Sequence, residues 1–152
     1  MNVRPLARDE LPALAAALAA LPLMVRYRRD AAALARALEA ALARGDGLLV
    51  ADEGGPLLGL AWFTPAGTLG LGGYLRLIAV VAGGEGKGTG VALLRAFEGE
   101  TAKASAHAFL LVSDFNEGAI RFYEREGYSR VGAMPGLVLP DVAEVMYWKR
   151  LR

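Results

Sequence analysis

A run of glycines constrains the backbone of this chain more than any other feature of its sequence. Residues 83–90 read Gly-Gly-Glu-Gly-Lys-Gly-Thr-Gly, so five of eight positions are glycine. Because glycine loses more conformational freedom on folding than any other residue, such a cluster is favourable only where the chain turns tightly or closely approaches something. An apolar run precedes the segment, and Leu93, Leu94 and Phe97 follow it at helical spacing. The pattern predicts a connection from a strand to a helix N-terminus, where unpaired N–H groups favour bound anions.

Two familiar phosphate-binding motifs do not fit this segment. A Walker loop would need a glycine at Val81 and a hydroxyl side chain at Gly88, and a dinucleotide fingerprint would need a glycine at Val91. What remains is the pattern Gly86-x-Gly88-x-Gly90 at the start of a helix. Spacing alone leaves two interpretations open: a phosphate-binding loop, or a flexible connector whose glycines let a helix and a strand pack closely.

Length and composition favour one folded domain, residues 1–152. A chain of this length buries about 70% of the surface that it would expose when unfolded, and 55% apolar against 22% charged residues argues against disorder. The formal charge of +1 gives no basic excess, so nucleic acid is not an expected partner. The chain has no cysteine, which excludes disulfides, thiolate metal ligands and a cysteine nucleophile. We predict no metal site.

One apolar segment, Leu11–Leu23, resembles the apolar part of a signal peptide. However, Asp9 and Glu10 stand where such a peptide is basic, Pro12 and Pro22 bracket the segment, and it is too short to span a bilayer. We therefore predict a buried helix in a cytoplasmic protein with no membrane partner. The chain has no glutamine and only two asparagines, and this scarcity of thermolabile amides is typical of heat-adapted proteins.

Hydrophobic periodicity and turn residues predict the order of strands and helices. Strands are expected at Asn2–Leu6, Leu48–Asp52, Leu57–Thr64, Tyr74–Val81, Phe109–Val112, Tyr128–Val131 and Val142–Leu151. Helices are expected after the glycine segment and at Arg8–Leu21, Ala31–Arg44 and Asn116–Glu126. Asn116 is a natural N-cap, Gly127 is a natural C-terminal stop, and Gly67–Gly73 is expected to be a glycine-rich connection. This order predicts an α/β or α+β fold with a single sheet.

Two blocks of the sequence resemble the GNAT superfamily of N-acetyltransferases. Residues 85–94, Glu-Gly-Lys-Gly-Thr-Gly-Val-Ala-Leu-Leu, are similar to that family's cofactor loop, Arg/Gln-x-x-Gly-x-Gly/Ala, in all but the first residue. Residues 116–128, Asn-Glu-Gly-Ala-Ile-Arg-Phe-Tyr-Glu-Arg-Glu-Gly-Tyr, are similar to the family's Asn-x-x-Ala-x-x-Phe/Leu-Tyr-x-x-x-Gly-Phe/Tyr segment. The element order agrees over roughly residues 48–151. The resemblance implies a single mixed, mostly antiparallel central sheet flanked by helices, the acyl-CoA N-acyltransferase fold.

The resemblance also implies a cofactor and the residues that bind it. Acetyl-CoA would be the cosubstrate, with its pyrophosphate on the loop amides of Glu85, Gly86, Lys87, Gly88, Thr89 and Gly90. Its pantetheine arm would pair like an added strand with the backbone of Ile78 and Val80, a mode that needs an open strand edge. Asn116 would contact the cofactor in addition to capping its helix.

Tyr123 matches the tyrosine that acts in the family as general acid toward the departing thiolate. The reference pKa of tyrosine, about 10, exceeds that of a thiol, about 8.5, so complete proton transfer is uphill. A positioned donor still helps by hydrogen bonding as negative charge develops on sulfur. Tyr123 shares one helical face with Asn116, Ala119 and Ile120. A tyrosine that only packs is the alternative interpretation.

The cofactor loop departs from the family pattern at Glu85, which stands where the family has Arg or Gln. A carboxylate ~5 Å from a pyrophosphate charge could cost ~3 kcal/mol at an effective dielectric near 20, and less when solvated. Lys87 offsets part of this repulsion. We therefore expect weaker or differently shaped cofactor binding, but not its loss.

The general base is the second departure. Many family members carry an acidic residue on the strand before the loop, whereas residues 56–81 of this chain contain none. Asp30, Asp141 and Glu144 are candidates, and the sequence assigns none of them. His107, the only histidine, is expected to be structural.

These observations predict an N-acetyltransferase that moves acetyl directly from acetyl-CoA to a primary amine of a small molecule or peptide, without metal or covalent intermediate. The cluster Arg26, Arg28 and Arg29 lies in a connection that borders the acceptor site in the family, so it suits a negatively charged acceptor. A solvated helix end is the other interpretation of this cluster. A non-catalytic acyl-CoA sensor and a nucleotide-binding regulatory domain are the alternative functions, and a homodimer is left open.

Overall fold

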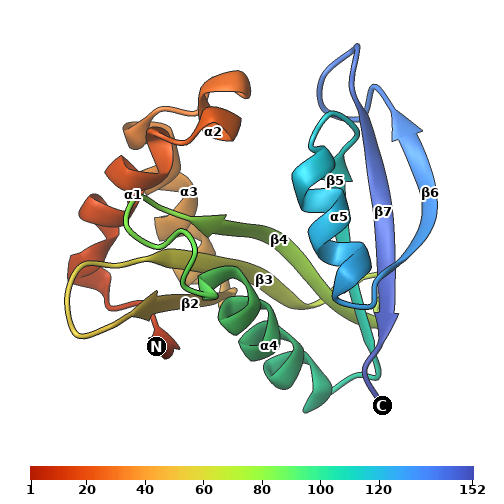
Figure 1. Ribbon diagram of the computed structural model, residues 1–152, viewed down its shortest axis with the longest axis horizontal. Helices are drawn as coiled ribbons and strands as arrows, with labels where there is room; N and C mark the ends of the chain where they lie inside the picture. The colour runs from red at the N-terminus through yellow and green to blue at the C-terminus, as the bar shows by residue number, and fades with distance from the viewer. The chain divides into compact units, whose positions relative to one another are not determined.

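Seven strands form one sheet in the computed structural model, which describes all residues from 1 to 152 (Figure 1). The strands are β1 (Asn2–Pro5), β2 (Gly47–Asp52), β3 (Gly59–Thr68), β4 (Gly72–Val80), β5 (His107–Ser113), β6 (Ser129–Pro135) and β7 (Ala143–Arg150). The helices are the 3₁₀ turn η1 (Arg8–Glu10), α1 (Leu11–Ala19), α2 (Pro22–Arg26), α3 (Ala31–Arg44), α4 (Thr89–Ala102) and α5 (Glu117–Arg125).

The strands follow the order β1-β2-β3-β4-β5-β7-β6 in the sheet. Strands β4 and β5 are parallel and pair from Gly73–Ala108 to Leu75–Leu110. The pairs β1–β2, β2–β3, β5–β7 and β6–β7 are antiparallel. The predicted fold class, a mixed and mostly antiparallel sheet flanked by helices, is therefore confirmed.

Several predicted boundaries were wrong, since β3 extends to Thr68 and β6 to Pro135, beyond the predicted ends at Thr64 and Val131. The helix expected at Arg8–Leu21 is divided into η1 and α1, and a short helix α2 follows it. Pro22 is the first residue of α2 and restricts the preceding Leu21 to an extended conformation with ψ 141°, so helix α1 cannot continue through it. No helix in the structure is both long enough and apolar enough to cross a membrane.

The connection expected at Gly67–Gly73 is a tight hairpin turn instead. Leu69 and Gly70 have φ values of +54° and +67°, and the Leu71 N–H donates to the Thr68 carbonyl over 2.8 Å. Two consecutive positive φ angles match the twist of an antiparallel pair, which allows β3 and β4 to extend toward the turn. The glycines that suggested a long loop therefore serve a two-residue turn and the ends of the strands.

The chain divides into two compact units, and the first comprises Met1–Thr64 and Leu77–Phe97. One face of its part of the sheet carries Val50, Leu60 and Trp62, which pack with buried residues of α1 and α3. The apolar residues of these helices recur at helical spacing and include Leu11, Leu14, Leu18, Leu34, Leu38 and Ala41. Burial of this amphipathic face, rather than helix propensity, stabilises the two helices.

The opposite face of the same unit receives the first half of α4. A Cβ at Gly59 would lie 2.9 Å from Leu93 and 3.1 Å from Thr89, so only glycine allows the helix this close. The Phe63 and Phe97 rings meet edge to face with centroids 5.2 Å apart. These contacts set where the N-terminus of α4, and hence the glycine loop, lies in this unit.

The second unit comprises Pro65–Arg76 and Glu98–Arg152. It contains β5, β6, β7, the first residues of β4, and helix α5, which runs along β5 and β7 (Figure 1). Its buried apolar residues alternate along the strands, as expected for a sheet with two distinct faces. They include Leu75, Ala108, Leu110, Val112, Val145 and Tyr147.

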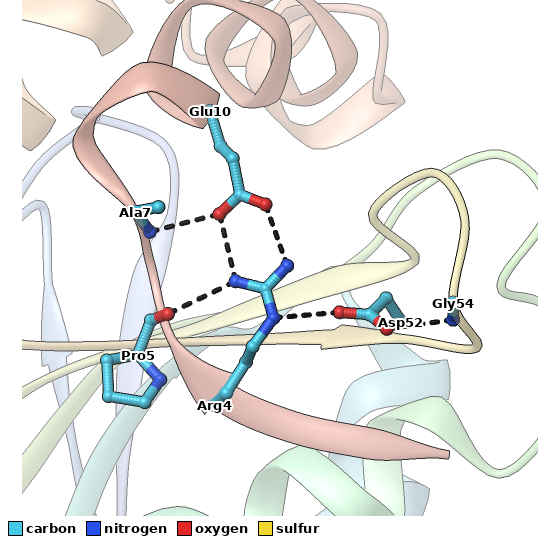
Figure 2. Close-up of polar contacts among 6 residues, drawn as sticks. All are labelled: Arg4, Pro5, Ala7, Glu10, Asp52 and Gly54. Atoms are coloured by element: carbon cyan, nitrogen blue, oxygen red, sulfur yellow. Dashed lines mark hydrogen bonds and ion pairs between the residues drawn. The ribbon is translucent and has the colours of Figure 1, made fainter.

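A charged network links the first strand to its neighbours (Figure 2). The Arg4 guanidinium donates to both carboxylate oxygens of Glu10, at 2.7 and 3.0 Å, and to Asp52 Oδ2 at 3.0 Å. The second Asp52 oxygen accepts from the Gly54 N–H over 2.9 Å, and Asp52 is buried. Bidentate geometry makes this one of the stronger classes of ion pair, so it connects β1, η1 and the end of β2.

Acid is expected to weaken this network. The pKa of Glu10 is lowered from its ordinary value of 4.5, first by the hydrogen bond from Arg4 and then by the Ala7 N–H. A carboxyl group whose pKa is lower in the folded than in the unfolded state stabilises the fold at pH values above its unfolded-state pKa. This stability is lost as the pH falls through the folded-state pKa. We therefore expect the melting temperature to fall more steeply between pH 5 and pH 3 in the unsubstituted protein than in Glu10→Gln.

The matched control for this prediction is Glu39→Gln, because Glu39 forms an ion pair with Arg8 in which both side chains are largely exposed. Its pH dependence is expected to resemble that of the unsubstituted protein. Equal acid sensitivity of Glu10→Gln and the unsubstituted protein would contradict the role of the network.

Candidate functional site

The glycine loop, residues 81–88, and the first two residues of α4 together present an unbroken row of unpaired backbone N–H groups. The amides of residues 85–90 donate no hydrogen bond within the protein, whereas those of Gly83, Gly84 and Ala92 on either side are paired. Gly86 and Gly88 have φ values of +71° and +78°, and both are exposed. Successive turn and left-handed conformations direct neighbouring N–H groups into one concavity, and the dipole of α4 adds positive potential there. The loop therefore suits an anion.

Buried contacts hold the base of this loop. The Thr89 hydroxyl is 1% exposed and donates to the Gly84 carbonyl over 2.8 Å, which links the first turn of α4 to the start of the loop. A Cβ at Gly84 would clash with the Leu58 carbonyl and approach Val80 within 3.0 Å. The loop thus needs glycine at position 84 for space and at positions 86 and 88 for backbone conformation.

The Glu85 carboxylate turns back onto its own loop. Its Oε2 accepts from the Gly83 N–H over 2.9 Å, and the side chain is exposed. Lys87 Nζ lies 3.3 Å from Glu53 Oε2, so its charge is also partly compensated within the protein. Glu85 therefore caps the loop by a local hydrogen bond, a role that the comparison with the family pattern did not predict.

Removing the charge of Glu85 is expected to strengthen binding of acetyl-CoA by a few fold, and Glu85→Gln is the suitable change because its amide oxygen can still accept from Gly83. An exposed charge is screened by salt, so the gain should shrink between 20 and 500 mM NaCl. Isothermal titration calorimetry at both salt concentrations measures it. Glu39→Gln is the control for general charge removal, because Glu39 is an exposed carboxylate of α3 that pairs with Arg8. An unchanged affinity in Glu85→Gln and in Glu85→Arg would remove the repulsion hypothesis.

Ile78 and Val80 lie in the last three residues of β4, directly before the loop. Both side chains are half-buried, and Ala79 between them is buried in the first unit's core. Because side chains alternate along a strand, Ile78 and Val80 lie on one face and Ala79 on the other.

Helix α5, in the second unit, has the two ends that its sequence predicts. Asn116 Oδ1 accepts from the Ala119 N–H over 3.2 Å, which makes Asn116 the N-cap. Gly127 has φ +93°, and the N–H groups of Gly127 and Tyr128 donate to Glu124 and Tyr123 carbonyls. This pair of bonds is a Schellman motif. The side-chain NH₂ of Asn116 has no partner in the protein and can donate to a ligand.

Tyr123 is the buried residue of α5, with 8% of its surface exposed. Its ring packs edge to face against Phe122 and Tyr128, with centroids 5.2 and 5.8 Å away. Its hydroxyl makes no hydrogen bond within the protein, and burial raises the pKa of Tyr123 well above its usual value near 10. The hydroxyl therefore stays protonated at neutral pH and can donate a hydrogen bond.

The three candidate bases differ in exposure and in hydrogen-bond partners. Asp30 is exposed and caps α3 by accepting from the Ala33 N–H over 2.8 Å, and Asp141 is exposed in the β6–β7 connection. Glu144, in β7, is 8% exposed and accepts from the Ser113 hydroxyl over 3.3 Å. His107 Nδ1 accepts from the Trp148 indole N–H over 3.0 Å, so its interaction is with the sheet, as predicted for a structural residue.

The arginines of the predicted acceptor region lie in the first unit at and after the end of α2. Arg26 is the last residue of this helix, and Arg28 and Arg29 follow in the turn before α3. All three are exposed, and Arg28 has φ +54°, an uncommon conformation for a residue other than glycine.

Of the sequence-predicted residues, the loop residues Glu85–Gly90 lie together in the first unit with Ile78 and Val80, while Asn116 and Tyr123 lie together in the second. Sequence reasoning missed the side chains around Glu144, which are Tyr74 and Arg76 of β4 and Ser113 of β5. No local motif connects these positions, because only the register of the sheet brings them near one another.

A mixed sheet with a glycine loop between β4 and α4 is the arrangement expected for an acyltransferase of the family that the sequence resembles, and comparisons of the sequence agree with this expectation. Residues 14–128, more than half of the chain, match the family described as Acetyltransferase (GNAT) family. The chain belongs to this family. A comparison with curated proteins finds no match.

Solved structures share the fold over nearly the whole chain. N-acetyltransferase from Staphylococcus aureus Mu50 aligns with a TM-score of 0.77 at 20% identity, covering 99% of this chain and 98% of that chain. Ribosomal-protein-alanine N-acetyltransferase from Brucella melitensis aligns with a TM-score of 0.78 at 18% identity, covering 99% of each chain. An aminoglycoside 6'-N-acetyltransferase complexed with coenzyme A aligns with a TM-score of 0.79 at 18% identity, covering 100% of this chain and 98% of that chain.

Proposed function

We propose that this chain transfers the acetyl group of acetyl-CoA directly to a primary amine. The observation that carries the proposal is the row of unpaired amides at residues 85–90, at the N-terminus of α4, in a chain of the GNAT family. Such a row suits a pyrophosphate better than a single carboxylate, because several N–H groups converge on one anionic group. We include residues 1–152 in one transferase domain, since the solved structures align over 99–100% of the chain.

In this proposal, acetyl-CoA binds along β4 and the loop. The pyrophosphate accepts from the amides of Glu85, Gly86, Lys87, Gly88, Thr89 and Gly90. The pantetheine arm pairs with the backbone of Ile78 and Val80, and the unpaired NH₂ of Asn116 donates to the cofactor. The related aminoglycoside acetyltransferase was solved with coenzyme A, which supports this ligand class.

The transfer itself needs a nucleophile, an electrophile and a proton donor. The neutral amine attacks the thioester carbonyl, so a C–N bond forms while the C–S bond breaks. Tyr123 donates to the sulfur as negative charge develops there. Because burial raises the pKa of Tyr123, donation of a hydrogen bond contributes more than complete proton transfer, and the thiolate takes its proton finally from water.

The acceptor is proposed to be an amine of a small molecule or a peptide. Two of the related structures are named for an aminoglycoside and for a ribosomal-protein alanine as acceptors, so the fold accommodates both kinds. The exposed Arg26, Arg28 and Arg29 favour an acceptor with negative charge. Reversing their charges should then raise the KM of anionic amines and leave that of neutral amines unchanged.

A non-catalytic acyl-CoA sensor is the second candidate function. The observation that favours it is the absence of any carboxylate between residues 56 and 81, the stretch that supplies the base in many family members. A sensor would bind acetyl-CoA and coenzyme A through the same loop amides without turning over an amine.

One pair of experiments separates these functions. Calorimetry with acetyl-CoA, coenzyme A and ATP measures binding, and a thiol-release assay measures turnover with kanamycin, spermidine, free glutamate and an alanine-terminated peptide. We expect acetyl-CoA to bind and at least one amine to be acetylated. Binding without turnover on any amine would favour the sensor, and binding of ATP alone would contradict both functions.

A further inference from the structure

Glu144 is a buried carboxylate of the second unit that the proposed chemistry has not used. The sheet register pairs Glu144 with Ser113, and it pairs Phe109 with Trp148 in the same two strands. Strand β4 adds Tyr74, whose partner in β5 is Phe109. Because registered side chains point to the same face and alternate along each strand, Tyr74, Ser113 and Glu144 all lie on one face of the sheet.

These groups form a polar site on a face that also carries the apolar side chains Phe109, Leu111, Met146 and Trp148. Tyr74 is half-buried, and its pKa is raised first by burial, is lowered in part by the charge of Arg76, and is raised further by the charge of Glu144. Tyr74 is thus within electrostatic reach of both Arg76 and Glu144. Burying a carboxylate costs free energy unless it has partners, and a buried carboxylate beside other titratable groups is a candidate functional group.

The other face of the same strands belongs to α5. Lys149, at an odd separation from Glu144 along β7, lies over the Tyr128 ring at 5.6 Å, and that ring packs against Tyr123. Tyr123 and Glu144 therefore approach β5 and β7 from opposite faces. Aminolysis of a thioester uses an acid at the sulfur and a base at the nitrogen, which are different atoms, so two side chains that do not contact each other can serve the two roles.

We propose that Glu144 is the general base that takes a proton from the acceptor amine. The proposal rests on the transferase function above. As the N–C bond forms, the nitrogen becomes more acidic and one N–H proton passes to the Glu144 carboxylate. The electron pair of the C–S bond leaves with sulfur, and Glu144 returns its proton to water. Ser113 positions the carboxylate, through a hydrogen bond that is long for an O–H donor.

Glu144→Gln tests the proposal, because glutamine can still accept from Ser113 but cannot take a proton. The assay uses the amine of the panel above with the fastest turnover, and the pH is varied from 6 to 10. We expect kcat to fall at least about 100-fold at pH 7. The deficit should narrow as the pH rises, because hydroxide can then take the proton from nitrogen in place of Glu144. Acetyl-CoA affinity should stay within twofold.

Asp114→Asn is the matched control. Asp114 is an exposed carboxylate next to Ser113 that accepts from the Ala143 N–H over 3.2 Å, an interaction that asparagine can keep. Its activity and pH profile are expected to match those of the unsubstituted protein. Glu144→Asp retains a carboxylate and should recover at least a tenth of the original rate. This variant also keeps the proposal testable if Glu144→Gln does not fold.

The outcomes distinguish the two proposals. Unchanged activity of Glu144→Gln at pH 7, an equal deficit at pH 7 and pH 10, or Glu144→Asp as slow as Glu144→Gln would overturn the base role while the transferase function stands. Failure of the unsubstituted protein to acetylate any amine of the panel, with acetyl-CoA still bound, would overturn both.

Discussion

Replacing Tyr123 with phenylalanine is expected to lower kcat for acetyl transfer by about 10²- to 10³-fold, the range for loss of one positioned donor. The ring of Tyr123 fills the buried position beside Phe122 and Tyr128, and phenylalanine keeps this packing. Its hydroxyl makes no hydrogen bond within the protein, so its removal leaves no partner unsatisfied. Affinity for acetyl-CoA, measured by calorimetry, should therefore stay within about twofold while steady-state kcat falls.

Tyr128→Phe is the matched control, because it removes a hydroxyl from the neighbouring ring. That hydroxyl donates to Glu98 Oε1 over 3.2 Å, so its loss should lower the melting temperature and leave kcat near its original value. A Tyr123→Phe variant with unchanged kcat would show that Tyr123 only packs. A loss of stability as large as that of Tyr128→Phe would also contradict the donor role.

The pH dependence gives a second check on Tyr123. Because burial raises its pKa, the hydroxyl should remain protonated as the pH rises through 10. The unsubstituted protein is therefore expected to show no decline in kcat from this group between pH 8 and pH 10. A decline in that range that disappears in Tyr123→Phe would contradict the raised pKa.

The double variant Gly86→Ala/Gly88→Ala is expected to weaken acetyl-CoA binding by about 30- to 700-fold. Both glycines have positive φ, which costs a residue with a Cβ about 1–2 kcal/mol. The space around both positions is open, so the free loop can relax to other conformations without a clash. Binding must then restore the strained conformation, and each 1.4 kcal/mol so spent is a factor of ten in Kd.

Calorimetry with acetyl-CoA and with coenzyme A measures this effect, and the two ligands should lose affinity equally because they share the pyrophosphate. Gly99→Ala is the control, since Gly99 is exposed within α4 and a Cβ there meets nothing within 4 Å. Alanine in a helix interior should raise stability by about 0.5–1 kcal/mol and leave Kd unchanged. Full affinity in the double variant would mean that the loop amides do not bind the cofactor.

Local sequence signals predicted the ends of α5 and the position of the loop correctly. Asn116 as N-cap and Gly127 as stop depend on hydrogen bonds within a few residues, so their chemistry is readable without the fold. Because such signals act only over a few residues, they do not predict features that depend on the pairing of strands. Glycines at 67–73 suggested a long connection, whereas the pairing of β3 and β4 makes a two-residue turn there.

The sequence by itself determined that a strand, a glycine-rich loop and a helix follow one another at residues 72–102, because glycine content, apolar periodicity and capping act over short distances. Tertiary structure alone decided which side chains surround Glu144. Tyr74, Ser113 and Glu144 come from three strands, and a shift of one residue in register would move any of them to the other face. Register depends on packing across the whole sheet, and no local pattern encodes it.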